Sequence, residues 1–238
     1  WEEINVEGLP QNTIFTKLLA DQAHNTLYIL GSNKTIYQSN DGSTWTATEW
    51  GTNVEDLFVI TPSSYLFAAK APNQDRVFAK IDLSQDDKTW ESTEVKAPID
   101  FPTKNISATF NTDKGTAFLI GQALDSETST IWMSDSGQSW VKINDVNSTQ
   151  NCPAFIQPQI FYYNNKLYAF DGTQNEIYSS IDGIYWNISK NKFLLPEEFN
   201  HQEAVVVVDL HQNIWLLEKS RNYIWKGILN LYNEYIKL

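Results

Sequence analysis

A heptapeptide that ends in tryptophan recurs four times, and this repeat constrains the fold more than any other feature of the sequence. Its copies end at Trp45, Trp90, Trp140 and Trp186, which are separated by 45, 50 and 46 residues. Trp1 stands 44 residues before Trp45, in the same phase. A fixed period of this length indicates a fold built from one repeated supersecondary unit.

Each repeat unit carries four short runs with the composition of β-strands. The first runs are apolar or alternating and cover 14–19, 57–60, 106–110, 160–163 and 204–208. The second and third runs centre on aliphatic–aromatic pairs, such as Leu27-Tyr28 and Ile36-Tyr37 in the first unit. A fourth run follows each tryptophan, and β-branched and aromatic residues favour strands throughout. Since no stretch keeps a 3.6-residue apolar period, we expect few helices.

Four strands in 45–50 residues are typical of one β-propeller blade. We therefore predict an all-β fold, a single five-bladed propeller over 1–238 with units at about 10–50, 51–97, 98–147, 148–195 and 196–238. Residues 1–9 resemble an outer strand without its blade, and pairing them with the last unit would close the ring and cover an open edge. Two alternatives stay open: residues 232–238 form that strand, or the ring has six blades, one of them truncated.

The heptapeptides share the pattern Ser-x-Asp-Gly-x-x-Trp, which predicts a structural turn between the third and fourth strands. An aspartate there accepts backbone N–H bonds, and glycine takes a positive φ without steric cost. Asp87 replaces glycine in the second copy, and Ser136 replaces aspartate in the third. The residues with this structural role are Ser39, Asp41, Gly42, Trp45, Ser84, Asp86, Trp90, Ser134, Gly137, Trp140, Ser180, Asp182, Gly183 and Trp186.

This pattern resembles the Asp-box, or bacterial neuraminidase repeat, of sialidases, sortilin-like receptors and many secreted propellers, with one residue fewer between aspartate and tryptophan. The resemblance implies a propeller whose turns lie on the face opposite the usual ligand site. The Asn-rich loops and the ending Ile-Trp-Lys-Gly-Ile-Leu-Asn at 224–230 also resemble propeller domains of secreted Bacteroides-type lipoproteins. An extracytoplasmic location, in the periplasm or at the cell surface, is therefore expected, with any lipid anchor outside this chain.

Composition excludes several classes of function. A net charge of -12 without a basic stretch disfavours nucleic acid. The longest apolar stretch, 204–208, is far shorter than the roughly 20 residues of a membrane span. A lone Cys152 permits neither a disulfide framework nor a thiolate metal cage. The histidines, His24, His201 and His211, show no metal-ligand spacing. We expect a monomer without metal or cofactor.

The ligand site is expected on the face formed by the strand 4-to-1 and 2-to-3 loops. Aromatic side chains beside amides and carboxylates suit sugar rings, whose C–H faces stack while their hydroxyls form hydrogen bonds. The candidate ligand-binding residues in these loops are Trp50, Asp100, Phe101, Asn151, Gln174, Asn175, Glu197, Phe199, His201 and Arg221.

The sequence favours binding over catalysis, and no catalytic residue is assigned. The sialidase resemblance implies three arginines around the substrate carboxylate, but the chain has only Arg76 and Arg221. A glycosidase needs two carboxylates about 5–10 Å apart, and the loop candidates are Asp100, Asp125, Glu127, Glu197 and Glu198. We predict a non-catalytic module that binds a glycan or a protein partner. The alternatives are a carbohydrate-active enzyme other than a sialidase and a protein-assembly scaffold.

Overall fold

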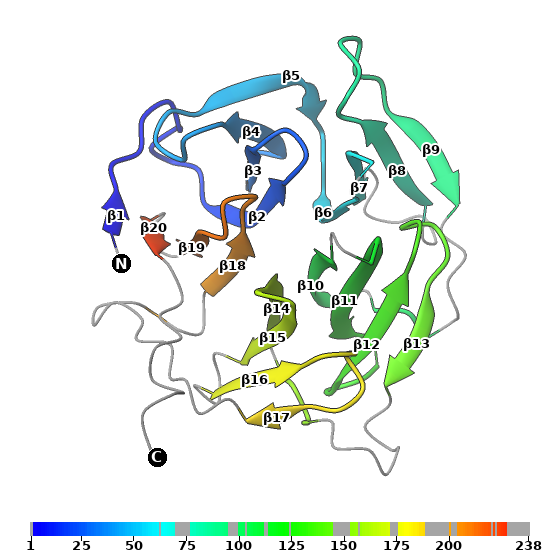
Figure 1. Ribbon diagram of the computed structural model, residues 1–238. Helices are drawn as coiled ribbons and strands as arrows, with labels where there is room; N and C mark the ends of the chain where they lie inside the picture. The colour runs from blue at the N-terminus through cyan, green and yellow to red at the C-terminus, as the bar shows by residue number, and fades with distance from the viewer. Residues whose placement is uncertain are drawn as a thin grey trace.

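Five four-stranded antiparallel sheets surround a central axis in the computed structural model (Figure 1), which confirms the predicted five-bladed propeller. The structure describes residues 2–61, 63–69, 77–94, 100–102, 104–111, 114–123, 125–144, 153–156, 158–171, 176–188, 200, 204–219, 221 and 223–227. Nowhere in these ranges is there a helix, and so none that could span a membrane.

Each blade runs from an inner strand at the axis to an outer strand at the rim. Blade I contains β2 (Phe15–Asp21), β3 (Thr26–Gly31), β4 (Thr35–Ser39) and β5 (Thr46–Thr52). Blade II contains β6 (Asp56–Ile60), β7 (Tyr65–Ala69), β8 (Val77–Asp82) and β9 (Glu91–Glu94). Blade III contains β10 (Lys104–Asn111), β11 (Thr116–Gln122), β12 (Ser129–Ser134) and β13 (Val141–Asn144). Blade IV contains β14 (Pro158–Tyr163), β15 (Lys166–Asp171), β16 (Glu176–Ser180) and β17 (Asn187–Ile188).

Blade V joins the two ends of the described chain. Its strands are β18 (Ala204–Val208), β19 (Ile214–Glu218), β20 (Tyr223–Gly227) and the N-terminal β1 (Glu2–Ile4). β1 pairs antiparallel with β20, with Glu3 opposite Trp225. The expected closure by the N-terminal strand is thus confirmed, and it covers an edge that would otherwise stay unpaired. The alternative strand at 232–238 lies outside the described residues.

The hydrophobic core lies between neighbouring blades. The closing seam is an example, where Leu18 and Leu27 of blade I share a cluster with Val205 and Trp215 of blade V. Both faces of most blades are therefore buried, and all five residues of β18 and all five of β19 are buried. Burial on both faces explains why these strands read in the sequence as short continuous apolar runs.

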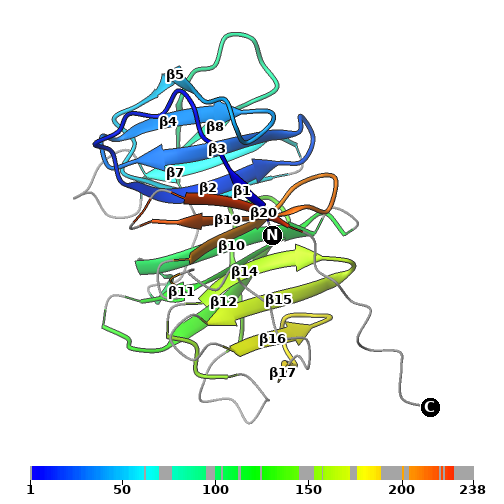
Figure 2. The same ribbon diagram turned by 90° about the vertical axis from the view of Figure 1, so that its left-hand side faces the viewer.

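The connections between strands separate the disc into two faces. Figure 2 shows the β2–β3 and β18–β19 connections on the same side of the disc, at the right of that view. Because strands alternate in direction, the heptapeptide turns between third and fourth strands lie on this side too. We call it the heptapeptide face; the opposite face carries the 4-to-1 and 2-to-3 connections.

Candidate functional site

The heptapeptides form turns that their own side chains hold together. In the first copy, Ser39 Oγ accepts the Gly42 N–H at 2.9 Å, and Asp41 Oδ1 accepts the next two N–H groups at 2.8 and 2.9 Å. The Trp45 indole N–H donates back to the Gly42 carbonyl at 2.9 Å. The bonds from the N–H groups of Thr44 and Ser43 hold the pKa of the Asp41 carboxyl at about 2.

The fourth copy repeats this arrangement, and the third retains most of it. Asp182 Oδ1 accepts the next two N–H groups at 2.8 and 3.1 Å. Partial burial opposes the shift, but these bonds keep the pKa of its carboxyl below the usual range. In the third copy the Ser136 hydroxyl accepts a single N–H at 3.2 Å in place of the carboxylate. These side chains satisfy the backbone, so the turns are structural.

The second copy differs from the prediction, because it does not form this turn. Ser84 donates both its backbone N–H and its hydroxyl to Asp82, at 2.9 and 2.6 Å, so the carboxylate that holds the turn precedes the heptapeptide. The Trp90 indole donates at 2.7 Å to the carbonyl of Trp50 in blade I. The physical reason is Asp87, since the other copies have glycine with positive φ at this position.

Two predicted ligand residues pack against the core, Phe101 fully buried and Trp50 partly buried. The sequence predicts Phe101 as a loop aromatic open to a ligand, but the residue is 2% exposed. Its ring centroid lies 5.2 Å from that of Trp132 and 5.9 Å from that of Trp140. Trp50 lies within β5, not in a loop, and its ring packs against Tyr28 and Trp90. The structure therefore corrects two expectations, because Phe101 is a core residue and Trp50 is a partly buried strand residue instead of a loop residue.

Two charged candidates are held by ion pairs. Asp100 binds Lys142 of β13 at 2.8 Å. The Arg221 guanidinium binds both oxygens of Glu218, at 2.7 and 2.8 Å, and this carboxylate is 1% exposed. A bidentate pair of this kind holds the Arg221 side chain against the end of β19. The other six candidates lie outside the described residues: Asn151, Gln174, Asn175, Glu197, Phe199 and His201.

A cavity of about 340 Å³ opens on the axis at the opposite face, where the inner strands begin. Each blade contributes to it, and most of its side chains are polar or charged. We call it the polar mouth. Its lining residues are Thr16, Lys17, Glu55, Asp56, Asn105, Ile106, Gln159, Ala204, Val205 and Lys219. None of the ten predicted ligand residues is among them.

Lys17 crosses the polar mouth and ties three blades together. Its ammonium donates to the carbonyl of Ile106 in blade III at 2.6 Å and lies 3.5 Å from Asp56 Oδ1 in blade II. The Ile106 carbonyl is available because the pairing of β10 with β11 shifts register between Lys104 and Ser107. A β-bulge of this kind redirects backbone groups away from the ladder.

The remaining groups of the polar mouth combine paired charges with amides. Glu55 accepts a bond from Lys34 at 2.5 Å, so each carboxylate of the mouth faces a lysine. The Asn105 amide donates to Gln122 at 2.7 Å. Within the described part of the chain, the Gln159 amide makes no hydrogen bond and is open to a ligand. Hydroxyl groups are the natural complement of such a set.

A sequence signal marks the polar mouth, although the composition of the loops does not reveal it. Asp56, Asn105 and Gln159 each stand directly before the predicted first apolar run of their unit, at 57, 106 and 160. Equivalent positions of a repeat meet around the axis of a propeller. A polar residue at the start of several inner strands therefore predicts a polar channel mouth.

A serine, a histidine and an aspartate also meet between blades I and II, but not as a catalytic relay. His24 Nδ1 lies 2.8 Å from Asp21 Oδ2 and 3.1 Å from Ser64 Oγ. A nucleophilic triad uses the two ring nitrogens separately, whereas here one nitrogen faces both partners. Ser64 is 2% exposed, so no substrate reaches its hydroxyl. The cluster stabilises the contact between the two blades.

The comparisons with other proteins agree with the fold. A protein-family model described as "DUF6242 beta propeller domain" matches residues 1–233. No curated protein matches the sequence.

Several solved structures have a similar fold at low identity. One chain of a nidogen/laminin complex is 11% identical with a TM-score of 0.56, over 91% of this chain and 76% of that chain. The endo-arabinase from Bacteroides thetaiotaomicron is 13% identical with a TM-score of 0.53, over 97% and 98%. The Hadza microbial sialidase Hz136 is 14% identical with a TM-score of 0.51, over 90% and 52%. At such identities the likeness concerns the fold alone.

Proposed function

Since the chain belongs to the family of the DUF6242 beta propeller domain, we propose that it is a non-catalytic binding module whose polar mouth holds the end of a glycan. The observation that carries the proposal is the convergence of polar side chains from the inner strands on one cavity of about 340 Å³. That volume falls within the range of small-molecule sites, roughly 300–1,000 Å³.

The chemistry of the polar mouth suits hydroxyl groups. The Gln159 amide offers a donor and an acceptor, and the Thr16 hydroxyl offers either. Lys17 and Asp56 stand 3.5 Å apart, so a sugar hydroxyl between them can donate to the carboxylate and accept from the ammonium. Paired charges leave little net charge in the cavity, which favours a neutral polar ligand over an ion.

An enzyme is the second candidate, because Glu55 and Asp56 line the same cavity. In glycoside hydrolysis one carboxyl must hold a proton to act as the general acid. Each carboxylate here is already engaged by a lysine in an ion pair. This arrangement favours binding over acid catalysis. A protein-assembly role is third, since a partner surface would favour an exposed apolar patch rather than a polar cavity.

The finer identity of the repeats and the location of the protein are part of the proposal. The bonding of Ser39, Asp41 and Trp45 supports classing the heptapeptide turns as short Asp-boxes. An extracytoplasmic location rests on the resemblance to secreted propellers. Fractionation of cells that carry the full-length gene tests it, and recovery from the cytoplasm alone would reject it. Light scattering tests the expected monomer.

A glycan-array screen of the whole chain, paired with hydrolysis assays on the same sugars, tests the function. We expect binding without turnover, with the affinity reduced by Gln159→Ala. Turnover that disappears in Glu55→Gln or Asp56→Asn would instead establish the enzyme. Binding of no glycan, with the fold intact by circular dichroism, would reject the proposal.

A further inference from the structure

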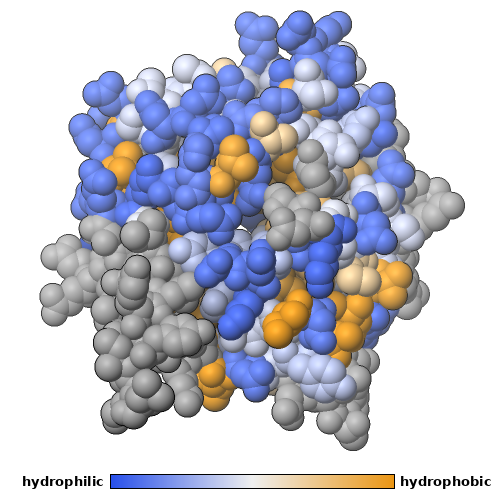
Figure 3. Space-filling view, in the orientation of Figure 1, coloured by the Kyte–Doolittle hydropathy of each residue, from blue (hydrophilic) through white to orange (hydrophobic). Residues whose placement is uncertain are grey.

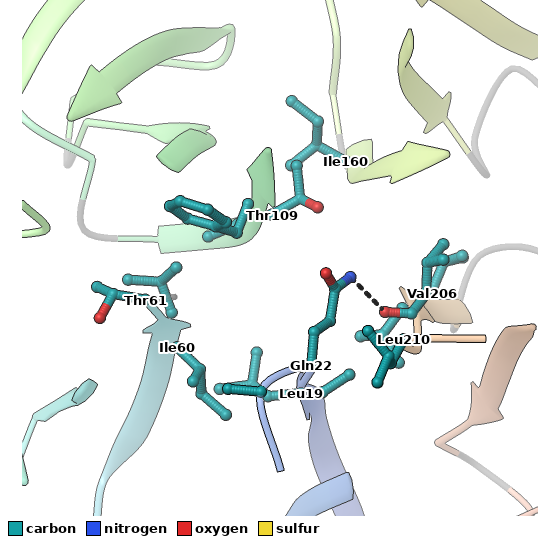
Figure 4. Close-up of a pocket in the computed structure, with 15 residues that line it drawn as sticks. Leu19, Gln22, Ile60, Thr61, Thr109, Ile160, Val206 and Leu210 are labelled. Carbon is teal, nitrogen blue, oxygen red and sulfur yellow. Dashed lines mark hydrogen bonds between the residues drawn. The ribbon is translucent and has the colours of Figure 1, made fainter. Parts of the chain in front are cut away.

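A second cavity opens at the other end of the channel, on the heptapeptide face. Its volume is about 200 Å³, and none of its lining residues belongs to the polar mouth. Figure 4 shows residues from all around the axis at its wall, on the inner strands and the connections that follow them. Most are apolar, among them Leu19, Ile60, Phe110, Ile160, Val206 and Leu210. We call it the apolar mouth.

The side chain of Gln22 brings an amide group into this mostly apolar cavity. The Gln22 Nε2 group donates to the Val208 carbonyl at 3.1 Å, which links blade I to blade V (Figure 4). This bond fixes the orientation of the amide, since only the nitrogen can donate to a carbonyl. Figure 4 shows the amide oxygen turned away from Val208, toward the middle of the cavity. Within the described residues no group donates to that oxygen.

The size and chemistry of the cavity specify a ligand. An apolar cavity of about 150 Å³ accommodates benzene, so the roughly 200 Å³ here holds a substituted ring. The free oxygen of Gln22 requires a donor on that ring, since an unmatched buried acceptor costs affinity. We propose that the apolar mouth binds a small aromatic molecule with one hydrogen-bond donor, such as a phenol.

The surroundings of the apolar mouth favour a free small molecule over a side chain of a protein partner. Figure 3 shows an opening near the middle of this face, surrounded mostly by hydrophilic residues. A protein hot spot usually sits within a wider apolar core that excludes water. The hydrophobic residues of this face form separate patches in Figure 3, not a continuous apolar surface around the opening. The ligand therefore differs in class and in position from the glycan proposed for the polar mouth.

Fluorine NMR titration of the whole chain with 4-fluorophenol and fluorobenzene tests this inference. The wild type should bind 4-fluorophenol more tightly than fluorobenzene. Gln22→Leu removes the acceptor but keeps the volume, so it should weaken 4-fluorophenol about fivefold, the usual effect of one hydrogen bond, and leave fluorobenzene unweakened. Ala108→Phe, or Ala20→Leu on another blade, should abolish binding of both probes by filling the cavity.

The controls separate this site from the glycan site and from unfolding. Gln159→Ala, at the polar mouth, should bind both probes as the wild type does, and melting temperatures verify that each variant is folded. The inference is overturned if folded wild type binds neither probe at millimolar concentration, or if both filling variants bind like wild type. Equal losses of both probes in Gln22→Leu would also overturn it, as would binding of a tyrosine-containing peptide without binding of 4-fluorophenol.

Discussion

Gly42 of blade I lies against the outer edge of the indole ring of Trp215 of blade V, so that a β-carbon on Gly42 would stand 2.2 Å from Trp215 Cζ3. The glycine also has a φ of +78°. Two requirements therefore meet at one position, because the turn needs a left-handed backbone and the ring of the neighbouring blade needs the space.

The same contact between a heptapeptide glycine and an aromatic ring of the preceding blade recurs in blades III and IV. A β-carbon on Gly137 would stand 2.7 Å from the ring of Phe67, and one on Gly183 would stand 3.2 Å from the ring of Phe118. Each aromatic comes from the second strand of the preceding blade. The heptapeptide glycine therefore serves blade-to-blade packing as well as the turn, which a pattern read within one repeat does not reveal.

Gly42→Ala should destabilise the protein much more than Gly115→Ala does. Gly115 has a φ of +67° with nothing within 4 Å of its β-carbon position, so it incurs only backbone strain, about 1 kcal/mol. Alanine at 42 adds a clash with a buried ring, for a total of about 3 kcal/mol. Urea unfolding measures both, and equal losses would show that the Trp215 contact has no energetic role.

The contribution of Asp41 to the free energy of unfolding should depend on pH. Its folded-state pKa of about 2 lies below the ordinary 3.8, so the unfolded chain takes up the proton first as the pH falls. The stabilisation is therefore complete above about pH 4 and is lost between about pH 4 and pH 2. Unfolding free energies of wild type and Asp41→Asn from pH 5 to 2 should converge toward low pH. A constant difference would contradict the carboxylate's role.

Ser136→Asp should stabilise the third heptapeptide turn. The serine hydroxyl accepts one N–H at 3.2 Å, whereas the aspartates of the first and fourth copies accept two at 2.8–3.1 Å. One further hydrogen bond is worth about 1 kcal/mol, which the neighbouring charge of Asp135 reduces. Thermal unfolding should show a higher melting temperature than for wild type, with Ser136→Asn as the uncharged control. A lower melting temperature would reject this explanation of the turn.

Removal of residues 1–8 should destabilise the whole ring. This segment supplies β1 and also bonds to the first turn, where the Glu7 N–H donates to Ser43 and the Trp45 N–H donates to Glu7, at 2.8 and 2.9 Å. Without it the edge of β20 is open to pairing with other chains. Size-exclusion chromatography should detect association, and a peptide of residues 1–8 added in trans should reverse it. A truncated chain that stays monomeric and equally stable would contradict the closure.

The sequence predicts the blades well because every inner strand is buried by its neighbours. The runs at 57–60 and 204–208 match β6 and β18 within one residue, since burial on both sides demands apolar residues at each position. The burial of residues that pack between strands far apart in the sequence is harder to predict. Phe101 has the composition of an exposed loop aromatic, but it packs between two tryptophans that lie 31 and 39 residues further along the chain.

The polar mouth is not evident from loop composition for a related reason. Its residues begin inner strands instead of occupying long loops, and only the ring geometry brings Asp56, Asn105 and Gln159 together. Residue type alone favours aromatic and acidic loop residues as ligand contacts. In the described chain such residues can be paired within the protein, as Asp100 is with Lys142. The position of a residue within its repeat therefore predicts better than its type whether it lines the central channel.

Isothermal titration of an array-identified glycan into wild type, Gln159→Ala and Gln22→Ala tests the central claim most directly, because the two glutamines line opposite mouths of one channel. Loss of one hydrogen bond at the polar mouth should weaken the glycan about fivefold in Gln159→Ala. Gln22→Ala should bind it with the affinity of wild type. Unchanged affinity in Gln159→Ala, or a loss confined to Gln22→Ala, would contradict the assignment of the glycan to the polar mouth.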